Sequence, residues 1–162
     1  MNKSMIIIYP GSYDNTDAYE SVLTYVSKKD YVFGYAIPQP LSRDSLIVSY
    51  RLAEEKSNYV GSRYIYHFTI SIPSKNHLKH LLELADNIAI TFGHHYQVTY
   101  SLDLETDHPH VHFAVNAYSY QPTYPYLTEG VFDIYIQDSC RLLQSYFPQY
   151  NAIVKYKEDT NV

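Results

Sequence analysis

The sequence is organised around residues 104–116, which read Leu-Glu-Thr-Asp-His-Pro-His-Val-His-Phe-Ala-Val-Asn. Three of the eight histidines of the chain fall here at alternate positions, and an apolar strand follows them. Because residues two apart in an extended chain point to the same face, His110 and His112 are expected to present two imidazoles side by side. This spacing is typical of metal ligands on a strand, although histidines in a polar turn are often only solvated.

A second strand is expected just before this stretch. Residues 95–103 are rich in β-branched and aromatic side chains, and the polar run from Asp103 to Pro109 is typical of a hairpin connection. Pairing of the two strands would bring Asp103 back toward His110 and His112. The sequence therefore predicts a carboxylate beside two imidazoles.

The fold class follows from the periodicity of the remaining segments. Apolar runs predict strands at 5–9, 64–72, 95–103, 110–118 and 152–156. Helices are predicted from Asn15 or Thr16 to about Lys28, over 73–92 and over 128–146, and also over 42–56, where a strand at 46–51 is the alternative. Residues 30–42 allow at most a short strand before a loop. The predicted fold is an α/β (α+β) sandwich, a central antiparallel-rich sheet of about five strands with helices on one or both faces.

Length and composition indicate one soluble domain, residues 1–162. The chain is 46% hydrophobic and 18% charged, as folded globular proteins are, and it contains no apolar run of the roughly 18 to 20 residues that cross a bilayer. The short apolar run at its start lacks the features of a secretory signal. We expect a cytoplasmic protein with no membrane partner, in which the single cysteine, Cys140, is packed in a helix.

The formal net charge of −5 is unusual for a protein that binds a polyanion. Its distribution is uneven, however: residues 1–80 hold nine Lys and Arg against seven acidic residues, and residues 81–162 hold three against ten. A nucleic acid is therefore expected to run over the first half, where unpaired bases can stack on some of the twenty tyrosines. The candidate DNA-binding residues are Lys28, Lys29, Arg43, Arg51 and Arg63.

The histidine segment with its following strand and Asn116 resembles the signature of the plasmid mobilisation relaxases. These are the tyrosine-dependent branch of the His-hydrophobic-His single-strand endonucleases. The resemblance extends to residues 64–73, Tyr-Ile-Tyr-His-Phe-Thr-Ile-Ser-Ile-Pro, which are similar to the strand before the long helix of the family. It also includes residues 22–26, Val-Leu-Thr-Tyr-Val, which are similar to the segment that carries the nucleophilic tyrosine. The resemblance implies a metal site at the centre of the sheet with the tyrosine helix above it.

The resemblance also implies a chemistry. Tyr25 would attack single-stranded DNA at an origin of transfer and form a 5′-phosphotyrosine, although an aromatic core residue is the simpler interpretation of its helical position. A divalent ion held by His110 and His112 would stabilise the charge that develops on the phosphate. Relaxases usually carry a third histidine seven residues before this pair, where the present chain has Asp103. A carboxylate there favours Mg or Mn.

The sequence leaves further metal-site residues and two other functions as alternatives. His67, His108 and Glu105 are candidates for a further ligand or for a neighbour that orients a ligand. Accessory mobilisation proteins are possible partners of a relaxase. Two other functions compete with the nuclease: a catalytically degenerate DNA-binding or protein-binding module on the same fold, and a metal-dependent phosphoesterase that uses water in place of Tyr25.

Overall fold

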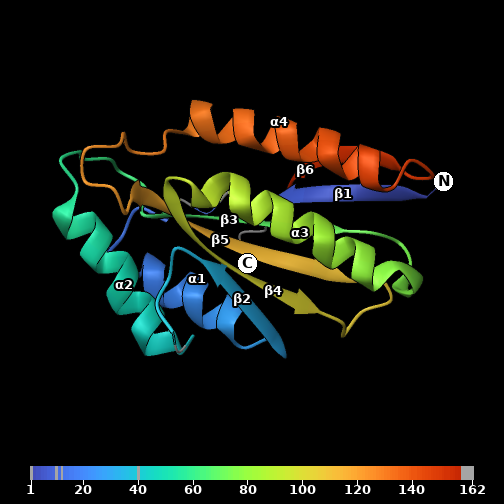
Figure 1. The fold of residues 1–162 in the computed structure, drawn as a ribbon, viewed down its shortest axis with the longest axis horizontal. Coiled ribbons are helices and arrows are strands. Elements are labelled where there is room, and N and C mark those ends of the chain that lie inside the picture. Colours follow the sequence, from blue (N-terminus) through green and yellow to red (C-terminus); the bar gives the residue numbers. More distant parts are fainter. Residues whose placement is uncertain (1, 10, 12, 40, 158–162) are drawn as a thin grey trace.

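The computed structural model describes residues 2–9, 11, 13–39 and 41–157. The strands formed by these residues are β1 (Lys3–Ile8), β2 (Tyr31–Tyr35), β3 (Ile65–Ser71), β4 (Tyr96–Asp103), β5 (His110–Ser119) and β6 (Asn151–Tyr156). The helices are α1 (Ala18–Ser27), α2 (Arg43–Lys56), the short 3₁₀ helix η1 (Lys75–His77), α3 (Leu78–Gly93) and α4 (Glu129–Tyr146). All of these strands join one mixed sheet in the order β2-β4-β5-β3-β1-β6 (Figure 1).

One of the two central strands of the sheet is β5, which carries the two histidines. It pairs antiparallel with β4 on one side and with β3 on the other. β1 is antiparallel to β3, and β6 closes that side of the sheet as a parallel neighbour of β1. The hairpin of β4 and β5 is as predicted, and so is the predominance of antiparallel pairs.

The expectation of about five strands was low by one. The additional strand is β2, which pairs antiparallel with β4 at the edge of the sheet. Its five residues are half-buried or exposed, and Gly34 interrupts its apolar run. Such a short edge strand gives little periodic signal, because only one side of it is paired and only part of its surface is covered.

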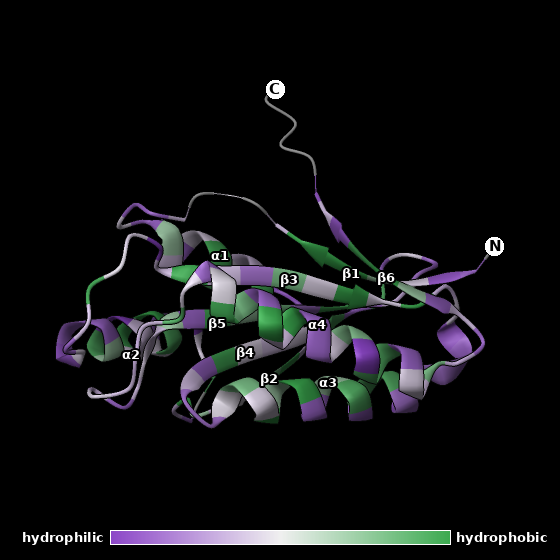
Figure 2. Ribbon diagram, turned by 90° about the horizontal axis from the view of Figure 1, so that it is seen from above, coloured by the Kyte–Doolittle hydropathy of each residue, from purple (hydrophilic) through white to green (hydrophobic). Residues whose placement is uncertain are grey.

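Helices cover both faces of the sheet. Figure 2 shows α1 and α3 on opposite sides of the strands. α3 and α4 cover the larger core, in which Phe68, Phe92 and Phe113 are fully buried. α1 and α2 cover part of the other face, where the backbone of β3 and β5 presents Ile65 and Ala114 to them. Among the described helices, none is long and apolar enough to cross a membrane.

Helix boundaries follow local capping. Ser42 caps α2 by accepting a hydrogen bond from the amide of Ser45, so the helical interpretation of this segment is confirmed and the alternative strand is wrong. Thr128 caps α4 in the same way. The third helix begins later than predicted, because Ser74 caps the 3₁₀ turn that precedes α3. On the α1 side the core also borders polar residues of β3, β4 and β5, among them His67, Asp103 and His112, which are buried.

Candidate metal and tyrosine site

The two histidines of β5 share one face of the sheet, as their spacing predicts, and that face is the α1 side. In the strand register, His110 stands opposite Asp103 of β4, and His112 stands between Ser101 of β4 and Thr69 of β3. The hairpin thus brings the carboxylate to the histidine pair. Because β5 is paired on both sides, these side chains stand on a rigid support.

A chain of polar contacts crosses three strands at this point. His67 of β3 has its Nε2 atom 3.3 Å from Nδ1 of His112. The other ring nitrogen of His112, Nε2, lies 3.6 Å from Oδ2 of Asp103. That same carboxylate oxygen lies 3.1 Å from Nζ of Lys29, which follows α1. The ring of His110 stands beside that of His112, with 6.3 Å between centroids.

The environment holds the imidazoles neutral. Burial, together with the charge of a neighbouring imidazole or lysine, lowers the pKa of His67 to about 3 and that of His112 to about 4. Burial also lowers the pKa of His110. For Asp103, burial acts to raise the pKa, but the amide of Glu105 and the ammonium of Lys29 outweigh it and hold the pKa below its usual value. Near neutral pH the site therefore contains neutral imidazoles and an ionised carboxylate.

Tyr25 lies over these histidines. It is in the last turns of α1, and its ring centroid is 5.2 Å from that of His112 and 5.7 Å from that of His67. The side chain is 43% exposed, although it belongs to a helix whose apolar residues are otherwise buried. An aromatic core residue would not have this exposure, so the simpler interpretation of its position does not hold.

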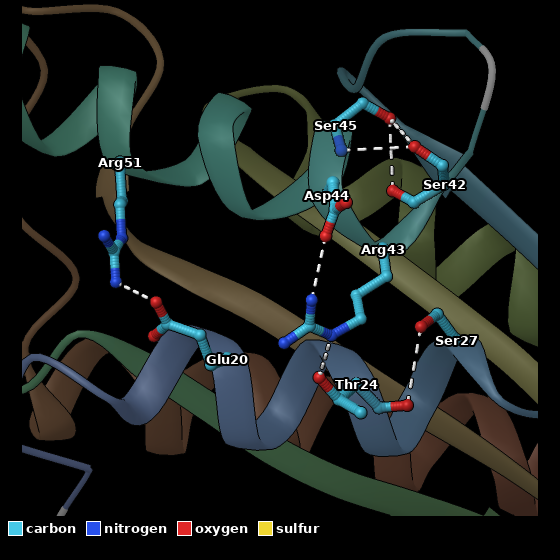
Figure 3. A network of polar contacts seen from close by, with 8 residues as sticks. All are labelled: Glu20, Thr24, Ser27, Ser42, Arg43, Asp44, Ser45 and Arg51. Carbon is cyan, nitrogen blue, oxygen red and sulfur yellow. Dashed lines mark hydrogen bonds and ion pairs between the residues drawn. The ribbon is translucent and has the colours of Figure 1, made fainter.

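Two of the candidate DNA-binding arginines hold α1 in place. Figure 3 shows Arg51 of α2 paired with Glu20 of α1, and Nε of Arg43 donating a hydrogen bond of 2.6 Å to the hydroxyl of Thr24. Both side chains bridge the two helices, so they fix the helix that carries Tyr25. They remain partly exposed.

The remaining basic candidates differ in exposure and in position. Lys28 is exposed. Lys29 turns inward and is 15% exposed. Arg63 is also turned inward, 14% exposed, where it lies over the ring of Tyr66 and 3.5 Å from a carboxylate oxygen of Glu129. The structure therefore brings Lys29 to the site and leaves Lys28 exposed after α1, while Arg63 lies elsewhere.

The turn between β4 and β5 contributes mainly through its backbone. Glu105 and His108 are exposed, and neither side chain enters the polar chain described above. The amide of Glu105 donates a hydrogen bond of 3.0 Å to Oδ1 of Asp103. The carbonyl of His108 accepts one from the hydroxyl of Thr106, which also lies 3.3 Å from Nδ1 of His110.

Sequence reasoning missed two residues beside His67. The ring of Tyr9 stacks on that imidazole with 4.1 Å between centroids, and the ammonium of Lys157 lies 4.8 Å from the centroid of Tyr9. A pocket of about 310 Å³ opens next to them, lined by Tyr9, Tyr13, Ser21, Val22, Tyr25, His67 and Lys157. No local signal identifies Lys157, because only the parallel pairing of β6 with β1 brings it to the site.

The side chains fit a divalent metal ion by their chemistry. Neutral imidazoles and an ionised carboxylate are the donors that Mn²⁺ and similar ions accept. The hydroxyls of Thr69 and Ser101, on either side of His112, are buried with no hydrogen-bond partner among the described residues. Yet the described part of the chain does not gather three His, Cys, Asp or Glu side chains closely enough to hold an ion as they stand. The ammonium of Lys29 already neutralises Asp103.

Comparisons with known proteins agree with the signature of the histidine segment. The model of the family described as "Relaxase: MobA/VirD2-like, nuclease domain" matches residues 26–126. That segment includes His67, Asp103 and both histidines of β5, and it begins one residue after Tyr25. The search of curated proteins finds no match.

One solved structure resembles the chain more distantly. It concerns the molecular basis of vancomycin resistance transfer in Staphylococcus aureus, and it is 14% identical over 83% of this chain and 78% of that chain, with a TM-score of 0.49. This likeness is too slight to carry a conclusion. The family match is different, because it spans more than half of the sequence. On that ground, the chain belongs to the MobA/VirD2-like relaxases and contains their nuclease domain.

Proposed function

We propose that this protein is a metal-dependent relaxase, a site-specific endonuclease and strand transferase that nicks single-stranded DNA through a covalent bond to Tyr25. The observation that carries the proposal is the position of Tyr25. A tyrosine with an exposed side chain lies directly over two neutral histidines on the central strands of the sheet.

In the proposed reaction, the phenolic oxygen of Tyr25 attacks the phosphorus of one phosphodiester. The bond from phosphorus to the 3′ oxygen breaks, so that the protein keeps the 5′ phosphate and the other strand end leaves as a 3′-hydroxyl. The proton of the phenol is lost, and a proton is taken up by the leaving oxygen. The phosphotyrosine retains the energy of the broken ester, so the reverse reaction rejoins DNA without a nucleotide cofactor.

His110, His112 and Asp103 are the residues that we propose to hold a divalent ion, Mg²⁺ or Mn²⁺. A bound ion would supply positive charge for the non-bridging oxygens of the attacked phosphate. The role of His67 is to orient His112. When Nδ1 of His112 donates its proton toward Nε2 of His67, the lone pair of its other nitrogen faces the site.

The DNA strand is proposed to pass beside α1. The pocket between Tyr25 and Tyr9 is of a size for one base, and the exposed Lys157 is the cation that lines it. A base can stack on an aromatic ring there while a lysine contacts its phosphate. This short basic path is compatible with the net negative charge of the chain, because the acidic residues lie largely in its second half.

The direct test is formation of a covalent protein–DNA adduct. The purified protein is incubated with Mn²⁺ and a pool of random-sequence single strands, labelled at the 3′ end or at the 5′ end. We expect the 3′ label alone to migrate with the denatured protein, because the protein keeps the 5′ phosphate of the downstream piece. Cleavage without an adduct would support the water-using phosphoesterase and contradict the proposal.

One observation favours the degenerate binding module as a second candidate. Lys29 already neutralises Asp103, as a cation would in a site that had lost its metal. That module would bind the single strands and yield neither label on the protein, with or without Mn²⁺.

A further inference from the structure

Lys29 is the only side chain of the Lys28–Lys29 pair that enters the site. Lys28 is exposed, whereas 15% of the Lys29 side chain is exposed. Its ammonium lies 3.1 Å from Oδ2 of Asp103 and 4.8 Å from the ring centroid of Tyr25. A lysine that only attracted DNA would gain nothing from leaving the solvent, so this position indicates a role inside the site.

The oxygen that Lys29 contacts is also the one that faces His112. Oδ2 of Asp103 is 3.1 Å from the ammonium and 3.6 Å from Nε2 of His112. An ion held between the carboxylate and that imidazole would have to use the same oxygen, at a bond length of about 2.1 Å for Mg²⁺. With the ammonium unmoved, the two cations would stand no more than roughly 5 Å apart, where they repel each other strongly.

Without a metal, the ion pair of Lys29 and Asp103 is favourable, because the two groups carry opposite charges at close range. The carboxylate of Asp103 is 11% exposed, and an unpaired charge at such a position is costly. The ammonium of Lys29 supplies the missing positive charge. Binding of a divalent ion would therefore exchange one cation for another.

We propose that Lys29 is a resident cation that competes with the divalent ion for Asp103 and thereby sets the metal affinity of the site. This inference rests on the proposed function, because it takes Asp103 as a metal ligand. It assigns Lys29 a role opposite to that of a ligand: the lysine weakens metal binding while it keeps the metal-free site neutral and ordered.

The test compares Mn²⁺ binding by calorimetry, without DNA and at constant ionic strength, for the wild type, Lys29→Met and Lys28→Met. Methionine keeps most of the apolar stem of lysine and removes the charge. We expect Lys29→Met to bind Mn²⁺ at least tenfold more tightly than the wild type, and Lys28→Met to match the wild type. Equal or weaker binding by Lys29→Met, or no binding by any of the three proteins, would overturn the inference.

A second measurement does not depend on a folded Lys29→Met protein. In the wild type with ¹³C-labelled lysine, saturating Mg²⁺ should shift the side-chain signal of Lys29 more than that of Lys28, since only Lys29 leaves a carboxylate. A Lys29 signal that stays in place would contradict the exchange. The adduct assay tests the proposed nuclease separately. If the wild type forms the adduct but its Mn²⁺ affinity does not depend on Lys29, this inference is overturned and the proposed nuclease function stands.

Discussion

The substitution Tyr25→Phe separates chemistry from stability in this protein. The hydroxyl of Tyr25 makes no hydrogen bond to any residue that the structure describes, and the side chain is 43% exposed. Phenylalanine keeps the ring against His67 and His112, so the free energy of unfolding should change by less than about 0.5 kcal/mol. The variant should bind single strands and metal as the wild type does, and it should form no adduct, because the attacking oxygen is gone.

Tyr19 in the same helix provides the matched control. Its side chain is 1% exposed, and its hydroxyl donates a hydrogen bond of 3.2 Å to Oδ1 of Asn116. Burial raises the pKa of this phenol well above its ordinary value, so Tyr19 is a poor nucleophile. Tyr19→Phe loses that hydrogen bond, but the amide of Tyr118 still donates to the same oxygen. The expected cost is therefore about 1 kcal/mol, or roughly 2–4 °C in Tm for a domain of this size.

Both variants are measured by urea unfolding and by the adduct assay at 25 °C, with mass spectrometry of the trapped peptide. We expect opposite patterns: Tyr25→Phe stable and unable to form the adduct, Tyr19→Phe less stable and active. An adduct formed by Tyr25→Phe, or a nucleotide attached to Tyr19, would refute the assignment.

Three further predictions concern the sheet beneath Tyr25. Replacing both His110 and His112 by Ala should weaken Mn²⁺ binding at least about 100-fold and abolish the adduct, with a native circular dichroism spectrum; metal affinity that survives the double substitution would exclude them as ligands. Asp103→His should move the metal preference toward Mn, Co or Ni, measured as relative affinities, and an unchanged order would show that Asp103 is not a ligand. Tyr50→Phe should cost about 1–3 kcal/mol in urea unfolding without loss of the adduct, because its buried hydroxyl bonds Thr99 at 2.9 Å and a carbonyl of β5 at 2.8 Å. An unchanged unfolding midpoint would contradict that last estimate.

Much of the fold was predictable from local patterns. Four predicted helices and five predicted strands are present, and the family suggested by the histidine segment is confirmed by the match over residues 26–126. The roles of Tyr25, His110, His112 and Asp103 stay predictions, although the structure gathers all four in one place. The basic residues were the weakest part, because a count of charges along the chain does not tell which side chains turn inward.

Sequence alone determined the features that depend on residues close together in the chain. The two-residue period of a strand puts His110 and His112 on one face, and a short polar turn returns Asp103 to them. Contacts between distant segments were decided only by the tertiary structure. The order and register of the strands place His67 against His112 and bring Lys157 to Tyr9, and the end of α1 delivers Lys29 to Asp103. These pairings follow from how the sheet and helices pack as a whole, and no local period in the sequence encodes them.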